Sequence, residues 1–333
     1  MKTELITLLK QRCTYVSCQE LCEKFGVSEA DIRKEIEQLK KDGYVIETME
    51  NRGYLLKEDT ARVFGYSEIE SHIQTAWAGR TLYYYASIDS TNLRAGLLAE
   101  EGAPEGTLVV ADEQSAGRGR RGRNWESPAG KNLYFTLLLR PKIAPDKASM
   151  LTLVMALSVA EAVKMLRHDD AACTVGIKWP NDILVNGRKI CGILTEMSLS
   201  MKKDCIDHLI IGVGVNVRRQ NFPDEFGSHA GALDEFFDPP VSRSELLAKI
   251  LYAFENAYKA FLEEESLKRL KSSYEAVLAN YGRNVRVLDP KGEYEGIARG
   301  IRDTGELIVE LDDGTTKDVY AGEVSVRGIY GYV

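Results

Sequence analysis

Residues 183–197 read Ile-Leu-Val-Asn-Gly-Arg-Lys-Ile-Cys-Gly-Ile-Leu-Thr-Glu-Met. Two apolar runs, Ile183–Val185 and Ile190–Met197, flank the pair Asn186-Gly187. This pair is typical of tight hairpins, because both central positions of such a turn need a positive φ. The hairpin predicts antiparallel pairing in the middle of the chain. The expected fold class is therefore α+β, with a mixed sheet rather than a purely parallel one.

The surrounding region, residues 61–277, alternates apolar strands with amphipathic helices, and we interpret it as one domain. Its pattern predicts further strands at 81–87, 107–112, 133–139, 175–179 and 208–213, and helices at 91–101, 148–167 and 244–264.

The turn before the hairpin reads Lys178-Trp179-Pro180-Asn181-Asp182. Pro180 fixes the turn and favours an extended Trp179. Lys178 then lies at a strand end, where its charge can face a pocket. Asp182 can accept hydrogen bonds or help to hold Mg²⁺. An ordinary turn with a surface lysine explains these residues equally well, so both interpretations stay open at this point.

A second distinctive segment, residues 117–125, reads Gly-Arg-Gly-Arg-Arg-Gly-Arg-Asn-Trp. It contains Gly-x-Gly-x-x-Gly, but a strand rather than a helix follows, and no acidic residue stands about 20 positions on to hold a ribose. The glycines expose backbone N–H groups, and the arginines supply forked donors for carboxylates and phosphates. Their mutual repulsion predicts that the loop becomes ordered when an anion binds. The alternative is a solvated basic loop.

Two smaller domains are expected at the ends of the chain. In residues 1–60, Ser17 starts a capping box with Glu20, and after Gly26 Ser28 caps a second helix, with Asp31 three residues on; a hairpin follows. This pattern predicts a winged helix-turn-helix. In residues 278–333, short β-rich runs are separated by turns at 289–292, 303–305 and 312–314, which predict a small β-barrel.

The composition excludes several classes of protein. The net charge of −7 argues against a generally nucleic-acid-binding surface, so DNA contact must come from a local patch. The most apolar stretch, Met150–Ala160, is too short to span a bilayer, and the N-terminus lacks the pattern of a signal peptide. Six cysteines without a Cys-x-x-Cys pair favour reduced thiols, hence the cytoplasm, no membrane association and no metal site from the protein alone.

Several of these segments together resemble the motifs of biotin–protein ligases, in the family's order. They are Ser90-Thr91-Asn92, Gln114, Gly117–Trp125, Lys178–Asp182, Lys189 and Gly212–Asn216. The whole chain is similar to the bifunctional bacterial form, a biotin ligase that is also the biotin operon repressor. The resemblance implies a class II tRNA synthetase-like central domain and an SH3-like C-terminal barrel. It also implies biotin and ATP with Mg²⁺ as ligands, a biotin carboxyl carrier protein and operator DNA as partners, and a homodimer when ligand is bound.

The family reaction has two steps. The biotin carboxylate attacks the α-phosphate of ATP to give biotinyl-5′-AMP and pyrophosphate, and a carrier lysine then attacks the mixed anhydride. By resemblance, one set of residues holds biotin: Ser90, Thr91, Asn92, Gln114, Arg118, Gly119, Arg120 and Lys189. A second set lies on the nucleotide side: Arg121, Trp125, Asn181 and Asn216. Lys178, Arg120 and Asp182 are the candidate catalytic residues, with Lys178 as electrostatic catalyst and Asp182 as an aid to deprotonating the incoming lysine.

One segment departs from the family pattern. Residues 230–233 read Ala-Gly-Ala-Leu, where the family usually carries hydroxyl side chains, so we assign no nucleotide contact there.

The N-terminal unit is electrically neutral, with ten Lys/Arg and ten Asp/Glu in residues 1–57. A strong DNA binder carries a basic footprint, so only Arg33, Lys34 and Arg52 remain as candidate DNA contacts. We favour DNA binding as a dimer; the alternative is a winged helix kept for stability or protein contacts. For the whole chain, the alternatives are a regulator that senses biotin without transferring it and a lipoate-type ligase. Residues 117–125, the Gly-Arg loop, and Lys178 argue against the sensor. The same loop favours biotin over lipoate.

Overall fold

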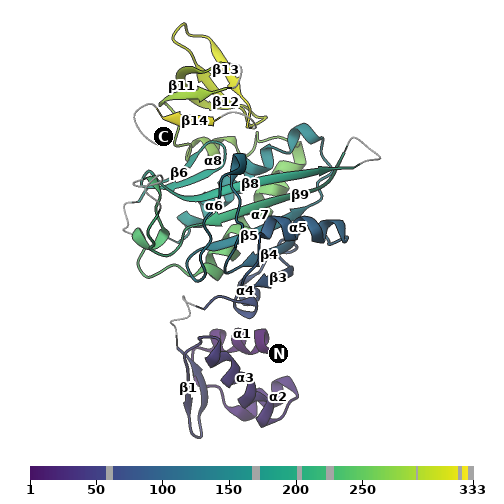
Figure 1. Ribbon diagram of the computed structural model, residues 1–333. Coiled ribbons are helices and arrows are strands. Elements are labelled where there is room, and N and C mark those ends of the chain that lie inside the picture. The colour runs from purple at the N-terminus through teal and green to yellow at the C-terminus, as the bar shows by residue number, and fades with distance from the viewer. Residues whose placement is uncertain are drawn as a thin grey trace.

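The computed structural model describes residues 1–57, 63–166, 173–200, 205–222, 229–289, 292–321 and 325–328. The molecule is elongated, and its described residues form three sheets, of two, seven and five strands (Figure 1). The small N-terminal unit lies at one end, the seven-stranded sheet in the middle and the five-stranded sheet at the other end. This arrangement confirms an α+β protein with a helix-turn-helix in front of a central mixed sheet.

The N-terminal unit consists of three helices and one hairpin: α1 (Lys2–Arg12), α2 (Cys18–Phe25), α3 (Glu29–Lys41), β1 (Ile46–Met49) and β2 (Gly53–Leu56). The predicted capping box of Ser28 and Asp31 is formed at the start of α3. At α2 only one of the two hydrogen bonds of the expected capping box is formed, so the prediction for Ser17 and Glu20 is half wrong. Ser17 caps the helix, but the Glu20 carboxylate pairs with Arg12 at 2.7 Å, because α1 brings that cation within reach.

The wing packs closely against the chain before α2. Val16 and Tyr54 exchange two backbone hydrogen bonds of 2.9 Å. Gly53 has a φ of +100°, and a Cβ at this position would lie 2.0 Å from the carbonyl oxygen of Val16. Only glycine therefore allows the wing to lie in this place.

The central sheet has the strand order β3-β4-β5-β9-β8-β7-β6. Its strands are β3 (Thr81–Tyr85), β4 (Thr107–Ala111), β5 (Leu133–Leu139), β6 (Val175–Lys178), β7 (Asp182–Val185), β8 (Arg188–Leu199) and β9 (Ile206–Val215). Strands β3 and β4 run parallel and every other neighbouring pair is antiparallel, so the sheet is mixed as predicted. Asn186 and Gly187 join β7 to β8 with φ values of 50° and 76°, which confirms the expected hairpin.

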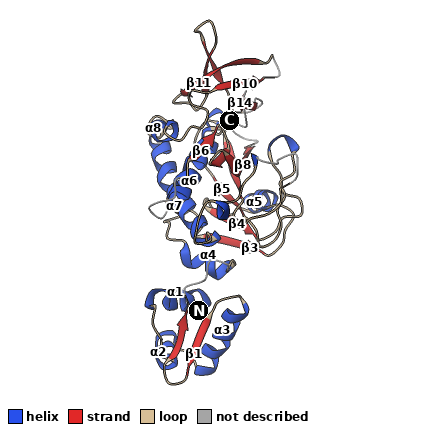
Figure 2. Ribbon diagram, turned by 90° about the vertical axis from the view of Figure 1, so that its left-hand side faces the viewer, coloured by secondary structure: helices blue, strands red, loops and turns tan. Residues whose placement is uncertain are grey.

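The two faces of this sheet are covered differently (Figure 2). Helices α6 (Met150–Lys164) and α7 (Arg243–Glu264) lie on one face, over a core that includes Phe135 and Val213. Helix α5 (Thr91–Glu100) lies on the other, where Leu98 packs against Leu138. Since side chains alternate along a strand, the even-numbered positions of β5, and of β9 from Leu209 onward, face α5, and the odd-numbered ones enter the main core.

Two short helices were not expected from the sequence, α4 (Tyr66–His72) and α8 (Lys271–Glu275). Single 3₁₀ turns also occur at Pro145–Lys147 and Leu233–Glu235. No helix within the described ranges is both long and apolar enough to cross a bilayer.

Helix α4 attaches the N-terminal unit to the central one through a buried carboxylate. Glu68 is 1% exposed and accepts hydrogen bonds from Lys10 Nζ at 2.6 Å and Tyr44 Oη at 2.5 Å. His72 Nε2 lies 3.0 Å from the same carboxylate. Burial opposes the charge, but the bonds from His72, Lys10 and Tyr44 outweigh it and lower the pKa of Glu68. We call these four residues the Glu68 cluster.

The C-terminal sheet is antiparallel in the order β13-β12-β11-β10-β14. Its strands are β10 (Asn284–Leu288), β11 (Tyr294–Ile301), β12 (Leu307–Glu310), β13 (Thr316–Val319) and β14 (Ser325–Gly328). Turns lie at 303–305 and 312–314 as predicted, whereas part of the turn at 289–292 falls outside the described residues. Strands β13 and β14 form opposite edges, so the described strands make an open sheet in place of the closed barrel that was expected.

We expect Glu68→Gln to lower the free energy of unfolding by about 2 kcal/mol, because Lys10 loses the charge of a buried partner. Urea unfolding followed by circular dichroism measures this. The control is Glu70→Gln on the same helix, where the exposed carboxylate accepts a hydrogen bond from Thr3; there the change should stay below about 0.5 kcal/mol. Equal effects of the two variants would contradict the role of the cluster.

Candidate active site

The floor of the site consists of glycines on the face of the central sheet that also carries α5. Gly192 of β8 and Gly214 of β9 are direct cross-strand partners. A Cβ at Gly214 would lie 2.5 Å from Trp125 Nε1, and one at Gly192 would lie 3.0 Å from Trp125 Cζ3. The indole of Trp125 therefore lies directly on the backbone of the two strands. We call Gly192, Gly212 and Gly214 the glycine floor.

Gly212 receives a second side chain in the same way. A Cβ there would lie 2.0 Å from Asn92 Oδ1. The Asn92 amide donates to Glu196 at 2.6 Å, and its oxygen accepts from Thr136 at 2.7 Å. Sequence reasoning noted the 212–216 segment only for Asn216, so the role of its glycines was missed. Asn216 itself is buried, just after the end of β9.

Polar side chains gather at the start of α5. Ser90, Thr91 and Asn92 are all buried there. The amide and hydroxyl of Thr91 donate to Gln114 Oε1 at 2.9 and 3.0 Å, and Gln114 Nε2 donates to Ser127 Oγ at 3.0 Å. Ser90 is the N-cap by position, but its hydroxyl makes no capping bond to the helix. The structure thus brings the predicted group 90–92 and Gln114 together, and adds Ser127 and Thr136.

The Gly-Arg loop folds back on itself in front of this group. Gly119 N donates to the Arg123 carbonyl at 2.7 Å, and Trp125 N donates to the Gly117 carbonyl at 3.0 Å. The loop contains one 3₁₀ turn, Arg120–Gly122, in which Arg121 is left-handed with a φ of 58°. No α-helix opens at the third glycine, in agreement with the rejection of a dinucleotide turn. Arg118, Arg121 and Arg123 are exposed, whereas Arg120 is half-buried.

Arg120 connects the loop to the turn at 178–182. Its Nη1 donates to Asn181 Oδ1 at 2.6 Å, and Asn181 Nδ2 donates to the Ile193 carbonyl at 3.2 Å. Burial lowers the pKa of Arg120, while the charge of Asp182 opposes this shift. The two segments singled out in the sequence therefore meet through one arginine–amide contact. The peptide bond between Trp179 and Pro180 in the turn is cis.

Two lysines flank one carboxylate beside this contact. Lys178 and Asp182 face each other across β6 and β7, and Asp182 pairs with Lys189 Nζ at 2.7 Å. Lys178 is 8% exposed. Burial lowers its pKa to about 8, although the charge of Asp182 acts in the opposite direction. Lys189 also lies 5.5 Å from the centre of the Trp125 ring. This arrangement supplies concentrated positive charge next to the glycine floor.

The C-terminal sheet reaches the same place. Arg327 of β14 is near enough to Lys178 for its charge to lower the pKa of that lysine, as do Lys189 and Arg123. Sequence reasoning missed Arg327, because it lies in a different domain with no motif around it. Among the described residues, no group of three or more His, Cys, Asp and Glu side chains could hold a metal ion.

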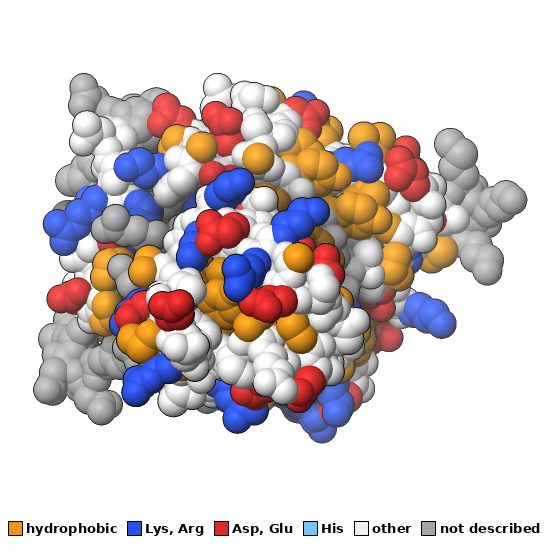
Figure 3. All heavy atoms as spheres, turned by 90° about the horizontal axis from the view of Figure 1, so that it is seen from below, with side chains coloured by type: hydrophobic (Ala, Val, Ile, Leu, Met, Phe, Trp, Pro, Cys, Tyr) orange, Lys and Arg blue, Asp and Glu red, His pale blue; other side chains and the backbone are white. Residues whose placement is uncertain are grey.

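The candidate DNA contacts lie apart from this site, in the N-terminal unit. Arg33, Lys34 and Arg52 are exposed, and Arg33 pairs with Glu29 at 2.5 Å. Seen from this end of the molecule, acidic and basic side chains are interspersed over the surface (Figure 3). The structure therefore agrees with the neutral charge counted in the sequence.

Comparison with known proteins covers all three units. Residues 84–216 match the biotin/lipoate A/B protein ligase family, residues 281–327 the biotin protein ligase C-terminal domain, and residues 2–55 an HTH domain. The bifunctional ligase/repressor of Bacillus subtilis is 36% identical over 329 residues, which covers 98% of each chain. That of Escherichia coli is 32% identical over 97% of this chain and 96% of its own.

A solved structure is also similar. The biotin protein ligase from Aquifex aeolicus, in complex with biotin and ATP, superposes with a TM-score of 0.63 at 33% identity. The match covers 75% of this chain and 99% of that one.

We predict that Lys178 titrates near pH 8 while exposed lysines titrate at about 10.4. Side-chain NMR of labelled lysine can measure this. Asp182→Asn should lower the pKa of Lys178 further, because the carboxylate favours the ammonium form. If Lys178 titrated together with the exposed lysines, its burial in the site would be disproved.

Proposed function

This chain belongs to the biotin protein ligase family, in its bifunctional ligase/repressor form, and on that basis we propose how its site works. The protein is a biotin–[acetyl-CoA-carboxylase] ligase with a repressor-type helix-turn-helix. The observation that carries the mechanism is the group of Lys178, Asp182, Lys189 and Arg120 beside the glycine floor.

In the first step, a carboxylate oxygen of biotin attacks the α-phosphorus of ATP. The new O–P bond forms as the bond to pyrophosphate breaks. Two anions have to meet, so fixed cations that offset their repulsion accelerate the reaction. Lys178 is the electrostatic catalyst, because its buried amine acts in a place where water screens little. Arg120 supplies a second cation from the loop.

Biotin lies beside Trp125 and Asn92, the two side chains that cover the glycine floor. Its polar ring faces the buried Ser90, Thr91 and Asn92 and the half-buried Gln114, which together form a set of neutral donors and acceptors. Its apolar part packs against Trp125, and its carboxylate points to Lys189. Arg118 and Gly119 close over it, and the Gly-Arg loop becomes more ordered when the negative charge arrives.

The nucleotide is placed next to Arg121, Trp125, Asn181 and Asn216. Asn181 acts partly through Arg120, since its amide oxygen already accepts from that side chain. Mg²⁺ comes with the triphosphate. Asp182 is the carboxylate in the site that fits a role in holding it, and its Oδ1 lies 2.7 Å from Lys189.

In the second step, a lysine of a biotin carboxyl carrier protein attacks the mixed anhydride, and AMP leaves. The attacking amine has to lose a proton. Asp182 can accept this proton once the ammonium group of Lys189 has left Asp182 and bound the ligand. The closed loop keeps water from the anhydride.

We further propose that the winged helix binds operator DNA as a homodimer when ligand is bound.

The domain limits proposed are 1–60, 61–277 and 278–333. A class II synthetase-like central sheet, an SH3-like C-terminal domain and a cytoplasmic location complete the proposal. The reduced cysteines support the location.

The decisive experiment incubates the protein with ATP, biotin and a carrier domain and measures the carrier by mass spectrometry. One biotinyl group should be added to the carrier, and only when both ATP and biotin are present. An unmodified carrier and no biotinyl-AMP, from a folded protein, would refute the proposed function.

Lys178→Ala should lower the rate of biotinyl-AMP formation about 10²- to 10³-fold, the effect of removing one preorganised charge. Pyrophosphate release measures the rate. Biotin at about 100 times Kd should still stabilise the variant by roughly 2.7 kcal/mol, which shows an intact fold and biotin site. Lys142→Ala, a change at an exposed lysine, is the matched control and should leave the rate unchanged.

Arg33→Ala, Lys34→Ala and Arg52→Ala should each weaken operator binding and reduce its salt slope by about 1, as expected for phosphate contacts. Glu29→Gln should strengthen binding, because it frees Arg33 and removes a negative charge from the start of α3. Fluorescence anisotropy at several salt concentrations measures both effects. Lys2→Ala on α1, the helix that packs against α4, is the control. Unchanged binding in all three arginine and lysine variants would rule out this surface.

A further inference from the structure

The turn that carries Lys178 is bound to the C-terminal sheet. Trp179, the residue after Lys178, is 2% exposed. Its indole Nε1 donates at 3.0 Å to the carbonyl of Gly305, in the turn between β11 and β12. Its backbone N donates at 2.9 Å to Asn280 Oδ1, in the segment that leads into β10. One residue thus ties the turn to the C-terminal part of the chain at two atoms.

The strand that ends at Lys178 is held by the same segment. Ile177 N donates to the Val277 carbonyl at 2.6 Å, and Ala279 N donates to the Ile177 carbonyl at 2.8 Å. These bonds form a parallel bridge between β6 and residues 277–279. Since β6 is an edge strand of the central sheet, this bridge covers the side of the strand that would otherwise be open.

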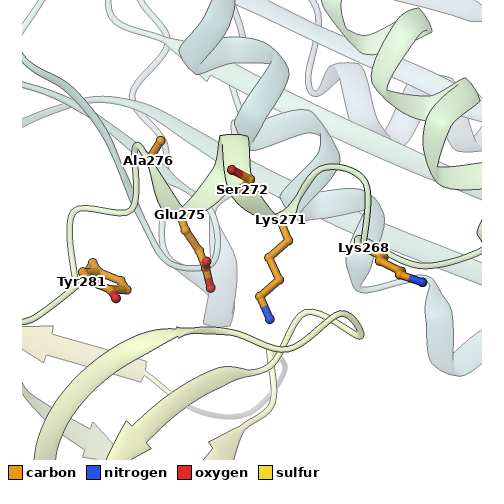
Figure 4. Close-up of a pocket in the computed structure, with 6 residues that line it drawn as sticks. All are labelled: Lys268, Lys271, Ser272, Glu275, Ala276 and Tyr281. Carbon is orange, nitrogen blue, oxygen red and sulfur yellow. The ribbon is translucent and has the colours of Figure 1, made fainter.

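The junction between the two units combines apolar packing with open space, because one core cluster runs from the central sheet through Leu267 and Tyr274 into the C-terminal sheet. An open cavity of about 460 Å³ lies between α8 and the C-terminal sheet, and the side chains of Lys271 and Glu275 point towards that sheet (Figure 4). A second cavity of about 190 Å³ is lined by Met150, Leu153 and Gly305, among others. Glu275 crosses the junction by accepting from Ile301 N at 3.0 Å. Among the hydrogen bonds that reach from the central unit to the C-terminal part of the chain, those of Trp179 and Ile177 lie next to Lys178.

We propose that Trp179 and Asn280 are positioning residues, through which the C-terminal sheet holds Lys178 in place for the adenylation step. This inference rests on the function proposed above. A buried amine acts on the transition state only when it is held close to its productive position, and a displacement of about 1 Å is costly. Neither residue touches the substrates in this account; both act through the backbone next to Lys178.

Such positioning of Lys178 has an effect on pH dependence that a purely structural role of Trp179 lacks. Burial lowers the pKa of Lys178 to about 8. The charge of Asp182 opposes this shift, and the charges of Lys189, Arg327 and Arg123 add to it. If the turn detaches from the C-terminal sheet, Lys178 becomes more hydrated and Arg327 moves away from it. Both changes favour the ammonium form and raise the pKa of Lys178. The alkaline limb of kcat/KM for adenylation, which reports the free enzyme, then moves to higher pH.

The test is Trp179→Phe, which keeps an aromatic ring and removes the N–H that Gly305 accepts. Pyrophosphate release from ATP and biotin is measured between about pH 6.5 and pH 10. Wild-type kcat/KM should fall above about pH 8. The variant should be about tenfold less active at neutral pH, and the alkaline limb of its kcat/KM profile should lie about one pH unit higher. Trp77→Phe is the matched control, since its ring packs against Phe254 and Tyr258 away from the site; rate and limb should both stay unchanged.

Asn280→Ala provides a second variant, which removes the acceptor of the Trp179 backbone N–H and should shift the limb in the same direction. A fall in rate with an unmoved limb in both variants would show a merely structural role and overturn the inference, as would an unchanged rate. A wild-type protein that makes no biotinyl-AMP contradicts the proposed function instead. Thermal unfolding of each variant confirms that it is folded.

Discussion

The buried positive charge of Lys178 is the constraint on which the site depends. An ammonium group with 8% exposure is costly unless nearby groups compensate, and here one carboxylate, Asp182, serves both Lys178 and Lys189. The excess of positive charge is what two anionic substrates can neutralise. Arg120 adds to this excess from the loop through its contact with Asn181. Before the substrates bind, the site therefore carries more positive than negative charge. This suits a protein that has to bring a carboxylate to a triphosphate.

The central sheet makes room for this charge by separating its two faces. On β5 and β9, odd-numbered residues such as Phe135 and Val213 build the core under α6 and α7. On the other face, Thr136 and the glycine floor leave the backbone open to Asn92 and Trp125. Glycine is needed because any Cβ would occupy the space of these side chains. The same strands thus supply a packed core on one side and a polar, glycine-lined surface on the other.

Polar contacts help to fix the outer units to the central one. The Glu68 cluster holds the winged helix, and the Trp179 bonds hold the C-terminal sheet. Between them, Arg243 is 4% exposed, pairs with Asp112 at 2.6 Å and lies 3.9 Å from the ring centre of Phe64. It connects the chain that follows the winged helix to the end of β4, close to the site. Such contacts can change one at a time, unlike the apolar core, which runs without a break from the central unit into the C-terminal sheet.

The sequence by itself determined the features that depend on local backbone geometry. The Asn186-Gly187 hairpin, the capping box of Ser28 and Asp31 and the rejection of a dinucleotide turn all follow from conformational preferences of neighbouring residues. The motifs also identified residues that the fold brings together, such as Thr91 and Gln114. Only the tertiary structure decided which distant groups meet. Arg12 pairs with Glu20, so that Glu20 does not complete a capping box, and Asn92 and Trp125 lie on the glycine floor. Trp179 donates a hydrogen bond to Gly305, 126 positions away. Burial and long-range pairing set these contacts and the pKa of Lys178, and no local pattern in the chain encodes either of them.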